Sequence, residues 1–182
     1  MTQKVDVLII GAGIIGLATA KALLESDSKL RVVILEKELS LGFHASGRNS
    51  GVLHAGFYYT PESLKAQFCK DGNSELRKLC QEFDIPVREV GKVVVTKSMD
   101  EEVQLEALFR RGTLNGVNLE FLPRKDLVHF EPLATTKENF VWSPETAVSD
   151  PQKVISEIAH KVTELGCKIV FGQLASLSPA HN

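Results

Sequence analysis

The sequence predicts an α/β fold built on a parallel β-sheet, and three features near its N-terminus support that prediction. Residues 5–10 form an apolar run with little polar alternation, as expected for a strand that is covered on both faces. Good helix formers with one apolar face follow in residues 17–24. A second run, residues 31–35, is rich in β-branched side chains and leads directly to Glu36. The order strand, tight turn, helix, strand is that of a βαβ unit.

The turn between the first strand and the helix has the spacing Gly11-x-Gly13-x-x-Gly16. Gly11 permits a sharp turn, Gly13 lets the backbone approach a diphosphate, and Gly16 lets helix and strand pack closely. The N–H groups and the positive dipole end of the helix would face the phosphates. An ordinary glycine-rich turn would explain one of these glycines. It would not explain three glycines at this spacing followed by an acid, Glu36, at the expected distance along the chain. We therefore predict a dinucleotide site on six residues: Gly11, Ala12, Gly13, Ile14, Ile15 and Gly16.

Glu36 lies twenty positions after Gly16, at the end of the second strand. An acid at this place accepts hydrogen bonds from ribose hydroxyls, and its charge would repel a 2′-phosphate, which argues against NADP. Residues 37–51 are rich in glycine and serine and predict a loop. Such a loop can return to the cofactor, because ligands of these sheets lie at the carboxyl ends of the strands. Its candidate cofactor residues are Lys37, Ser46, Arg48, Asn49, Ser50 and Gly51.

Composition narrows the class of protein. The 182 residues suit one domain or one and a half, and 43% hydrophobic residues suffice for a buried core. A net charge of −2 without a basic stripe gives no support for nucleic acid as a partner. Three cysteines without CxxC spacing indicate reduced thiols of a cytoplasmic protein. Residues 7–20 are uncharged, but they are too short to span a membrane.

His54 stands in an apolar and aromatic stretch, residues 52–59. From the residues alone, a hydrogen-bonded core histidine is the favoured interpretation. A metal site formed by His44 and His54 is disfavoured, because no cysteine or carboxylate completes a recognisable ligand set. The site prediction therefore includes no metal.

The run from Gly47 to Ala66, with the strings NSGVLHAGFYY and SLKA, resembles the L-2-hydroxyglutarate oxidases and dehydrogenases. These belong to the FAD-dependent oxidoreductases of the D-amino-acid-oxidase type, which also include glycine and sarcosine oxidases. The glycine motif is shared by that whole superfamily, whereas the two strings carry the substrate assignment. In one departure, the place where the superfamily often has a Gly-Gly doublet reads Leu41-Gly42-Phe43-His44.

The resemblance implies FAD as the cofactor and a Rossmann-like FAD-binding βαβ domain with an inserted α+β substrate-side region. A 2-hydroxy acid, L-2-hydroxyglutarate in the first place, would pass a hydride from C2 to flavin N5 and become the 2-oxo acid. His54 is the candidate base, because an imidazole titrates near neutrality. Arg48 and Lys65 are candidate partners of a substrate carboxylate, and an arginine fork is the better geometric match. Tyr59 is a further candidate substrate residue.

The remaining residues predict further short helices and strands. Helix starts are indicated at Thr60-Pro61, at the capping box Ser98-x-x-Glu101 and at Asp150-Pro151. Strands are expected at residues 91–96, 118–122, 140–142 and 167–172, with a helical turn at 124–129.

Three segments follow from this layout. Residues 1–84 are expected to form the first part of the FAD-binding domain, 85–146 the inserted substrate-side region, and 147–182 the return to the FAD-binding domain. The enzymes of the resembled family are considerably longer. We therefore expect an N-terminal fragment whose FAD-binding domain is incomplete at the C-terminus.

Two alternative functions stay open. One is an amine, glycine or D-amino-acid oxidase of the same superfamily, which the glycine motif does not separate from the first interpretation. The other is a dinucleotide-binding fragment without catalysis. Oxygen or a quinone is the expected electron acceptor. We expect a cytoplasmic location and leave open peripheral attachment to the inner membrane.

Overall fold

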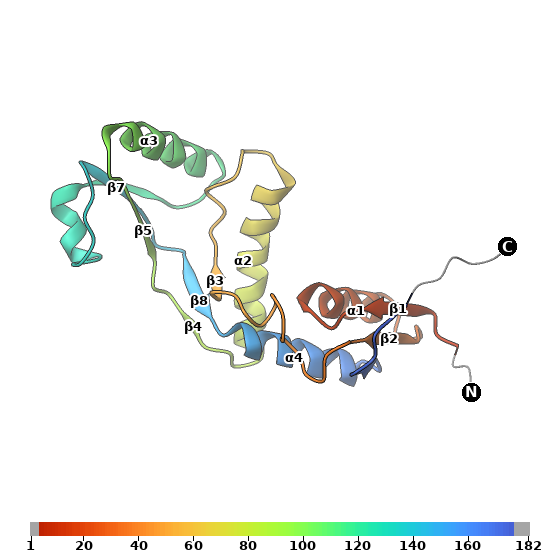
Figure 1. The fold of residues 1–182 in the computed structure, drawn as a ribbon. Coiled ribbons are helices and arrows are strands. Elements are labelled where there is room, and N and C mark those ends of the chain that lie inside the picture. The colour runs from red at the N-terminus through yellow and green to blue at the C-terminus, as the bar shows by residue number, and fades with distance from the viewer. Residues whose placement is uncertain (1–3, 177–182) are drawn as a thin grey trace. The chain divides into compact units, whose positions relative to one another are not determined.

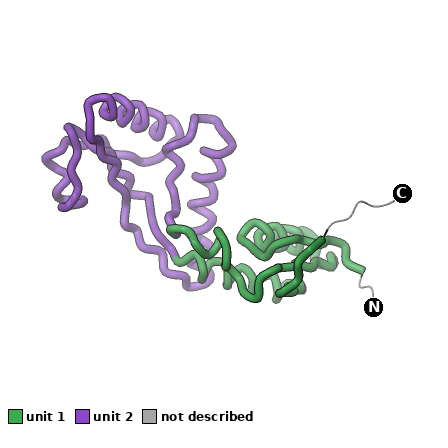
Figure 2. The backbone as a smooth tube through the Cα atoms, viewed as in Figure 1, with its two compact units in different colours: residues 1–50, 150–182 green, residues 51–149 purple. Residues whose placement is uncertain are grey.

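The chain forms two compact units in the computed structural model, which describes residues 4–176. The first unit consists of residues 1–50 and 150–182, and the second of residues 51–149 (Figure 2). The sequence prediction divided the chain after residues 84 and 146 instead. Residues 51–84 pack within the second unit because Val52 and Leu53 pair with the strand at Ala147–Ser149. The functional roles assigned to the three predicted segments stay predictions.

The first unit contains the predicted βαβ arrangement, and the α/β fold class is confirmed. Its parallel sheet has the order β1-β2-β9, with β2 in the centre (Figure 1). Val7 pairs with Val32, and Ile34 pairs with Ile169. The elements of this unit are β1 (Val7–Ile10), α1 (Ile14–Ser26), β2 (Val32–Leu35), α4 (Pro151–Glu164) and β9 (Lys168–Val170).

The two faces of this sheet differ in burial. Val32 and Ile34 lie on the buried face, where α1 packs on β1 and β2 and also against α4. On the other face, Leu8 and Ile10 are 49% and 54% exposed. A parallel sheet normally buries both faces, which explains why the sequence of these strands shows no polar alternation.

Helix α4 begins as its sequence predicts. The Asp150 carboxylate accepts hydrogen bonds from the N–H groups of Gln152 and Lys153, at 2.9 and 3.2 Å, and Pro151 occupies the first turn. These contacts satisfy N–H groups that have no partner within the helix. The buried face of α4 carries Val154, Ile155, Ile158, Ala159 and Val162.

The second unit has two three-stranded antiparallel sheets, in the orders β3-β8-β4 and β5-β7-β6. The predicted strands and the predicted helical turn are present, whereas β3, β4 and β8 have only two or three residues and show no periodic signal in the sequence. Its elements are β3 (Val52–Leu53), α2 (Leu64–Glu82), β4 (Val87–Arg88), β5 (Lys92–Val95), α3 (Met99–Leu114), β6 (Glu120–Pro123), the 3₁₀ helix η1 (Arg124–His129), β7 (Asn139–Ser143) and β8 (Ala147–Ser149).

The predicted start of α2 is wrong by three residues. Ser63, not Thr60, is the N-cap, and its hydroxyl oxygen accepts a hydrogen bond from the N–H of Ala66 at 3.2 Å. Glu62 has a φ of 63°, which a helix does not admit, so the helix cannot begin at Pro61. The prediction for α3 is confirmed, since the Ser98 hydroxyl accepts a hydrogen bond from the N–H of Glu101.

No helix within residues 4–176 combines the length and the apolar character needed to cross a lipid bilayer.

Candidate functional site

The turn between β1 and α1 has the geometry that its glycines predict. Gly11 has a φ of +98°, and its N–H donates a hydrogen bond to the Leu35 carbonyl at 2.7 Å. A Cβ on Gly16 would overlap the carbonyl oxygen of Gly11. A Cβ on Gly13 would lie 3.0 Å from the Ser46 hydroxyl. The three glycines thus allow, in turn, a left-handed backbone, a close approach to a neighbouring loop and a close helix–strand contact.

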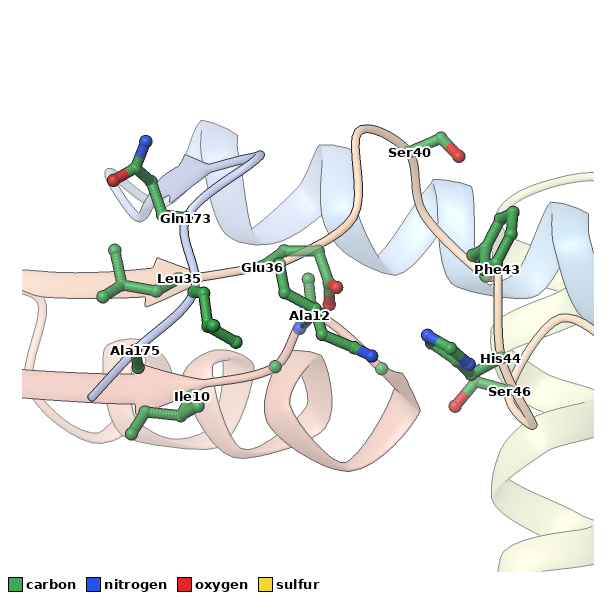
Figure 3. Close-up of a pocket in the computed structure, with 15 residues that line it drawn as sticks. Ile10, Ala12, Leu35, Glu36, Ser40, Phe43, His44, Ser46, Gln173 and Ala175 are labelled. Carbon is green, nitrogen blue, oxygen red and sulfur yellow. Dashed lines mark hydrogen bonds between the residues drawn. The ribbon is translucent and has the colours of Figure 1, made fainter. Parts of the chain in front are cut away.

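Glu36 reaches from the end of β2 back to this turn. Glu36 and Ala12 lie side by side in Figure 3, and one carboxylate oxygen of Glu36 accepts a hydrogen bond from the N–H of Ala12 at 2.8 Å. The other carboxylate oxygen accepts one from the N–H of Glu38 at 2.9 Å. An acid at the end of the second strand is therefore in direct contact with the glycine turn. This contact joins two motifs that lie 24 residues apart.

The N-terminus of α1 is covered by a hydroxyl from the loop after β2. The Ser46 oxygen accepts a hydrogen bond from the N–H of Ile14 at 3.0 Å, whereas the N-cap residue Gly13 has no side chain to do so. Asn49 orders this loop, because its amide donates to the carbonyls of Ala45 and Ser46 at 3.1 and 2.9 Å. The first turn of α1 contains no acidic residue of its own, and the nearby negative charge is that of Glu36, which is bonded to the N–H of Ala12.

A cleft of about 300 Å³ lies at the carboxyl ends of β1 and β2, entirely within the first unit. Figure 3 shows apolar side chains such as Ile10 and Leu35 at one part of it and the polar side chains of Glu36 and Ser46 at another. The lining residues are Ile10, Gly11, Ala12, Gly13, Leu35, Glu36, Lys37, Ser40, Gly42, Phe43, His44, Ser46, Gln173, Leu174 and Ala175.

Six of the predicted cofactor residues line this cleft, namely Gly11, Ala12, Gly13, Glu36, Lys37 and Ser46. The others do not line it. Ile14, Ile15 and Gly16 belong to the first turn of α1, and the Ile15 side chain is 78% exposed. Arg48, Asn49 and Ser50 lie further along the loop. Gly51 belongs to the second unit, where its carbonyl accepts a hydrogen bond from the N–H of Ser149.

Several cleft residues lie outside the sequence prediction. Gln173, Leu174 and Ala175 follow β9, and only the tertiary structure brings them beside β1 and β2. The loop at Gly42 is tied to α4 by Gln152, whose side-chain amide donates to the Leu41 carbonyl at 3.1 Å. No local sequence motif indicates that Gln152 contacts this loop. The glycine at position 42 was the only hint of a close contact there, because a Cβ on Gly42 would overlap the Gln152 side chain.

Charged side chains surround one edge of the cleft. Glu38 lies 2.8 Å from His44 Nε2 and 3.3 Å from Lys37 Nζ, and the hydrogen bond from His44 lowers the pKa of the Glu38 carboxyl. The Arg48 guanidinium stacks 4.5 Å from the centre of the Phe43 ring. Within residues 4–176 no group of three or more histidine, cysteine or acidic side chains is arranged to hold a metal ion.

His54 lies in the second unit with an exposed side chain, between the buried residues Leu53 and Ala55. The favoured interpretation from the residues alone, a core histidine, is therefore wrong, because strand-like alternation turns this side chain outward. Although His54 is exposed, neighbouring groups remove part of the water around its ring, and this partial desolvation, together with the positive charge of Lys92, lowers the pKa of His54. The Lys92 ammonium lies 4.5 Å from the centre of the Tyr58 ring. His54 is thus an exposed imidazole that favours its neutral form.

Tyr59 and Lys65, both predicted to contact substrate, lie together in the second unit. The Lys65 ammonium is 4.6 Å from the centre of the Tyr59 ring. The neighbouring Cys69 thiol and burial raise the pKa of Tyr59. The predicted site residues therefore fall into two groups, with the cleft group and Arg48 in the first unit and His54, Tyr59 and Lys65 in the second.

Several curated relatives that match most of this chain are named L-2-hydroxyglutarate dehydrogenases. The mitochondrial L-2-hydroxyglutarate dehydrogenase of Dictyostelium discoideum is 40% identical over 87% of this chain and 36% of its own length. The mitochondrial L-2-hydroxyglutarate dehydrogenase of Homo sapiens is 36% identical over all of this chain and 40% of its own length. The L-2-hydroxyglutarate dehydrogenase of Escherichia coli is 36% identical over 97% of this chain and 42% of its own length. The chain thus spans about two fifths of these relatives.

Two solved structures of longer proteins share the fold. L-alpha-glycerophosphate oxidase from Mycoplasma pneumoniae, dithionite reduced and with FAD bound, has a TM-score of 0.82 and 28% identity over 94% of this chain and 45% of that one. Glycine oxidase from Geobacillus kaustophilus has a TM-score of 0.83 over 94% of this chain and 47% of that one, and at 22% identity this likeness concerns the fold alone. The family model described as FAD dependent oxidoreductase, of the DAO type, matches residues 6–181. The chain therefore belongs to the DAO family of FAD dependent oxidoreductases.

Proposed function

We propose that this protein is an FAD-dependent oxidoreductase that oxidises a 2-hydroxy acid, L-2-hydroxyglutarate in the first place, to the 2-oxo acid. The contact between Glu36 and the N–H of Ala12 is the observation that carries the cofactor part, because it joins the ribose-binding acid to the diphosphate-binding turn. The names of the relatives that match most of the chain support the substrate part.

The cleft fits the adenosine diphosphate portion of FAD. Gly11 has open space where a side chain would stand, and the positive dipole end of α1 beside it favours a diphosphate. The N–H groups of Gly11, Ala12 and Ile14 are bonded to Leu35, Glu36 and Ser46, so a diphosphate would have to use other donors of the turn or displace these contacts. Glu36 holds a carboxylate at the position that takes ribose hydroxyls. Ile10 and Leu35 offer an apolar wall for an adenine ring. Lys37, Ser46, Arg48, Asn49, Ser50 and Gly51 are the further proposed cofactor residues.

Bound FAD would supply an acceptor for two electrons and the hydrogen on C2 of the hydroxy acid. The residues of this chain would provide the rest of the chemistry. His54 would accept the hydroxyl proton, and its lowered pKa keeps the imidazole neutral and ready to do so near neutral pH. Lys65 or Arg48 would pair with a substrate carboxylate, and Tyr59 lies beside Lys65.

The test uses the protein expressed from its complete natural reading frame and loaded with FAD. We expect L-2-hydroxyglutarate to bleach the flavin absorbance under anaerobic conditions, whereas glycine, sarcosine and D-amino acids leave it unchanged. Bleaching by an amine or a D-amino acid, without bleaching by the hydroxy acid, would assign the protein to the amine and amino-acid oxidases instead. Failure to take up flavin would leave a dinucleotide-binding module without catalysis.

The electron acceptor is proposed to be oxygen or a quinone. Oxygen consumption compared with quinone reduction, under saturating hydroxy acid, distinguishes the two.

A cytoplasmic location, with or without peripheral attachment to the inner membrane, is tested by cell fractionation before and after a high-salt wash.

A further inference from the structure

The backbone that carries His54 and Tyr59 is an irregular segment, residues 53–59, that follows β3. Its side chains alternate, so that Leu53, Ala55 and Phe57 are 5%, 5% and 1% exposed while His54 points outward. Ala55 and Phe57 pack in one core cluster with Val117. Gly56 turns the backbone with a φ of +92°. The segment is therefore anchored in the core although it belongs to no helix or long strand.

Three side chains from the neighbouring helices bind the carbonyl groups of this segment. Asn73 of α2 donates from its amide to the carbonyls of Leu53 and His54, at 3.0 and 3.2 Å. Asn115, at the end of α3, donates to the carbonyls of Gly56 and Tyr59, at 3.2 and 2.9 Å. Carbonyl groups near a core need partners, and beyond Leu53, the last residue of β3, no strand pairing among residues 4–176 supplies them to this segment.

Arg111 of α3 adds a third contact, from Nη1 to the carbonyl of Tyr58 at 3.1 Å. Five carbonyls of the segment thus depend on donors from two helices. The path of residues 53–59 is set by where α2 and α3 place their side chains, rather than by local hydrogen bonds.

The Asn73 amide is held in one orientation by a contact to its oxygen. Arg77 donates from Nε to Asn73 Oδ1 at 2.8 Å, and Arg77 is itself bound to the Glu145 carbonyl at 2.7 Å and to the Glu89 carboxylate. This keeps the amide N–H groups of Asn73 directed at the segment. Asn115 differs, because its Oδ1 is buried without a hydrogen-bond partner among residues 4–176. An unpaired buried acceptor costs stability, so the value of Asn115 lies in its two donated bonds.

We propose that Asn73 and Asn115 are positioning residues that hold the backbone of residues 53–59 and thereby place His54 and Tyr59 toward substrate. The proposal rests on the function proposed above. Neither asparagine touches the reacting atoms, and each acts through the carbonyls that it binds. A displacement of about 1 Å in a group that takes a proton can lower a rate by about a hundredfold.

The test replaces each amide by a carboxylate of the same shape, with Asn73→Asp and Asn115→Asp in the FAD-loaded protein from the complete reading frame. A carboxylate cannot donate to the carbonyls and repels them. Asn118→Asp is the matched control, because Asn118 is exposed and the substitution adds the same charge nearby. Two readouts are needed: anaerobic flavin reduction per bound flavin across a range of pH, and hydrogen exchange of the amides in residues 53–59.

We expect the two variants to reduce bound flavin at least about tenfold more slowly than Asn118→Asp, with the pH profile displaced and exchange in residues 53–59 accelerated. Unchanged reduction per bound flavin, even with a lower melting temperature, would overturn the proposal and leave a purely structural role. If L-2-hydroxyglutarate does not reduce the flavin of the unsubstituted protein, the proposed function fails by itself. Hydrogen exchange then decides alone, since unchanged exchange in both variants overturns the positioning role and accelerated exchange confined to residues 53–59 supports it.

Discussion

Glu36 connects two parts of the first unit through one carboxylate. It accepts the N–H of Ala12 on one side and that of Glu38 on the other. Hydrogen bonds to an ionised group are stronger than those between neutral groups, so a single side chain can hold the glycine turn against the end of β2. The same carboxylate would hold the ribose of FAD, which makes it the most informative residue of the cleft to change.

Glu36→Gln keeps the shape of the side chain but removes its charge and one acceptor. We expect the dissociation constant for FAD to rise about tenfold or more, because hydrogen bonds to charged groups contribute about 1.5–3 kcal/mol. Fluorescence titration of the flavin-free protein measures this constant. Glu25→Gln is the control, since Glu25 pairs with Lys21 on the exposed face of α1 and does not line the cleft. Equal effects of both substitutions would contradict the role of Glu36.

Lys92 is one of the two causes that lower the pKa of His54, the larger being desolvation. Burial and the charge of Lys92 lower the pKa of His54 below its ordinary value of 6.5. If His54 is the base, the rate of flavin reduction falls as the pH drops through this lowered pKa. Lys92→Met removes one of the two causes, so we expect the acidic limb of the pH profile to move to higher pH. As a control, Lys97→Met should leave the acidic limb of the profile in place, and His54→Gln should abolish it. An acidic limb that does not move in Lys92→Met would argue against His54 as the base.

At the scale of elements, Glu102 ties α3 to the ends of two strands. Its carboxylate accepts hydrogen bonds from the Thr96 hydroxyl, from the N–H groups of Glu138 and Asn139 at 2.9 and 3.1 Å, and from the Asn139 amide. The residue is only 8% exposed. Burial alone would raise the pKa of Glu102, but these hydrogen bonds outweigh it and lower the pKa to about 2. Helix α3 is therefore held by the buried carboxylate of Glu102, whose hydrogen-bond donors are the backbone and polar side chains of Thr96, Glu138 and Asn139.

We expect Glu102→Gln to lower the free energy of unfolding by about 1–3 kcal/mol near neutral pH, since buried donors lose a charged acceptor. Because the pKa of Glu102 is lowered in the folded protein, its carboxylate contributes its full stabilisation at pH values above its ordinary pKa of 4.5. This contribution is lost as the pH falls toward the lowered pKa of about 2. The difference between the two proteins should therefore shrink with acidification. Urea unfolding at several pH values measures it, and Glu106→Gln, on the exposed face of α3, should show no such trend.

The crossing of β1 and α1 depends on Gly16. Gly16→Ala would overlap the Gly11 carbonyl, and we expect it to lower the free energy of unfolding by about 1–3 kcal/mol.

Gly72→Ala is the opposite case. Gly72 lies inside α2 with open space around it, so alanine should stabilise the protein by about 0.5–1 kcal/mol. Urea unfolding of both variants tests the pair, and a tolerated alanine at residue 16 would contradict the close-packing role of that glycine.

At the scale of the whole molecule, each unit is completed by segments far apart in the chain. Strand β9 pairs with β2 although the whole second unit lies between them in the chain, and β3 pairs with β8 across nearly 100 residues, with Val52 opposite Val148. The ends of residues 51–149 are thus held side by side by the bond between Gly51 and Ser149. A cleft lined by residues 10–13, 35–46 and 173–175 exists only when the chain has returned to the first unit.

We therefore expect ligand binding in this cleft to stabilise the first unit as a whole. FAD at one hundred times its dissociation constant should raise the free energy of unfolding by about 2.7 kcal/mol. Riboflavin, which lacks the diphosphate and the adenosine, should not do so at the same concentration. Thermal unfolding followed by circular dichroism makes the comparison. An equal shift with riboflavin would show that the glycine turn and Glu36 do not contribute to binding.

Local patterns predicted the elements well where a residue acts on its sequence neighbours. The spacing of Gly11, Gly13 and Gly16 and the caps at Ser98 and Asp150 describe the backbone within one turn, and the structure agrees with them. The start of α2 was misplaced because Thr60-Pro61 carries the same local signal as a true start. The positive φ of Glu62, which prevents it, is not encoded in a motif.

The sequence by itself determined the βαβ unit and the position of Glu36, because strand and helix periodicity and glycine spacing are properties of neighbouring residues. The family was indicated by the resemblance of the run from Gly47 to Ala66 to known enzymes, not by periodicity. Only the tertiary structure decided which distant groups complete each site. It brought Ser46 to the N-terminus of α1, Gln152 to the loop at Leu41, and Asn115 to the segment that carries His54. Such contacts join residues 32 to 111 positions apart. Their geometry depends on how whole elements pack, which no local pattern of residues records.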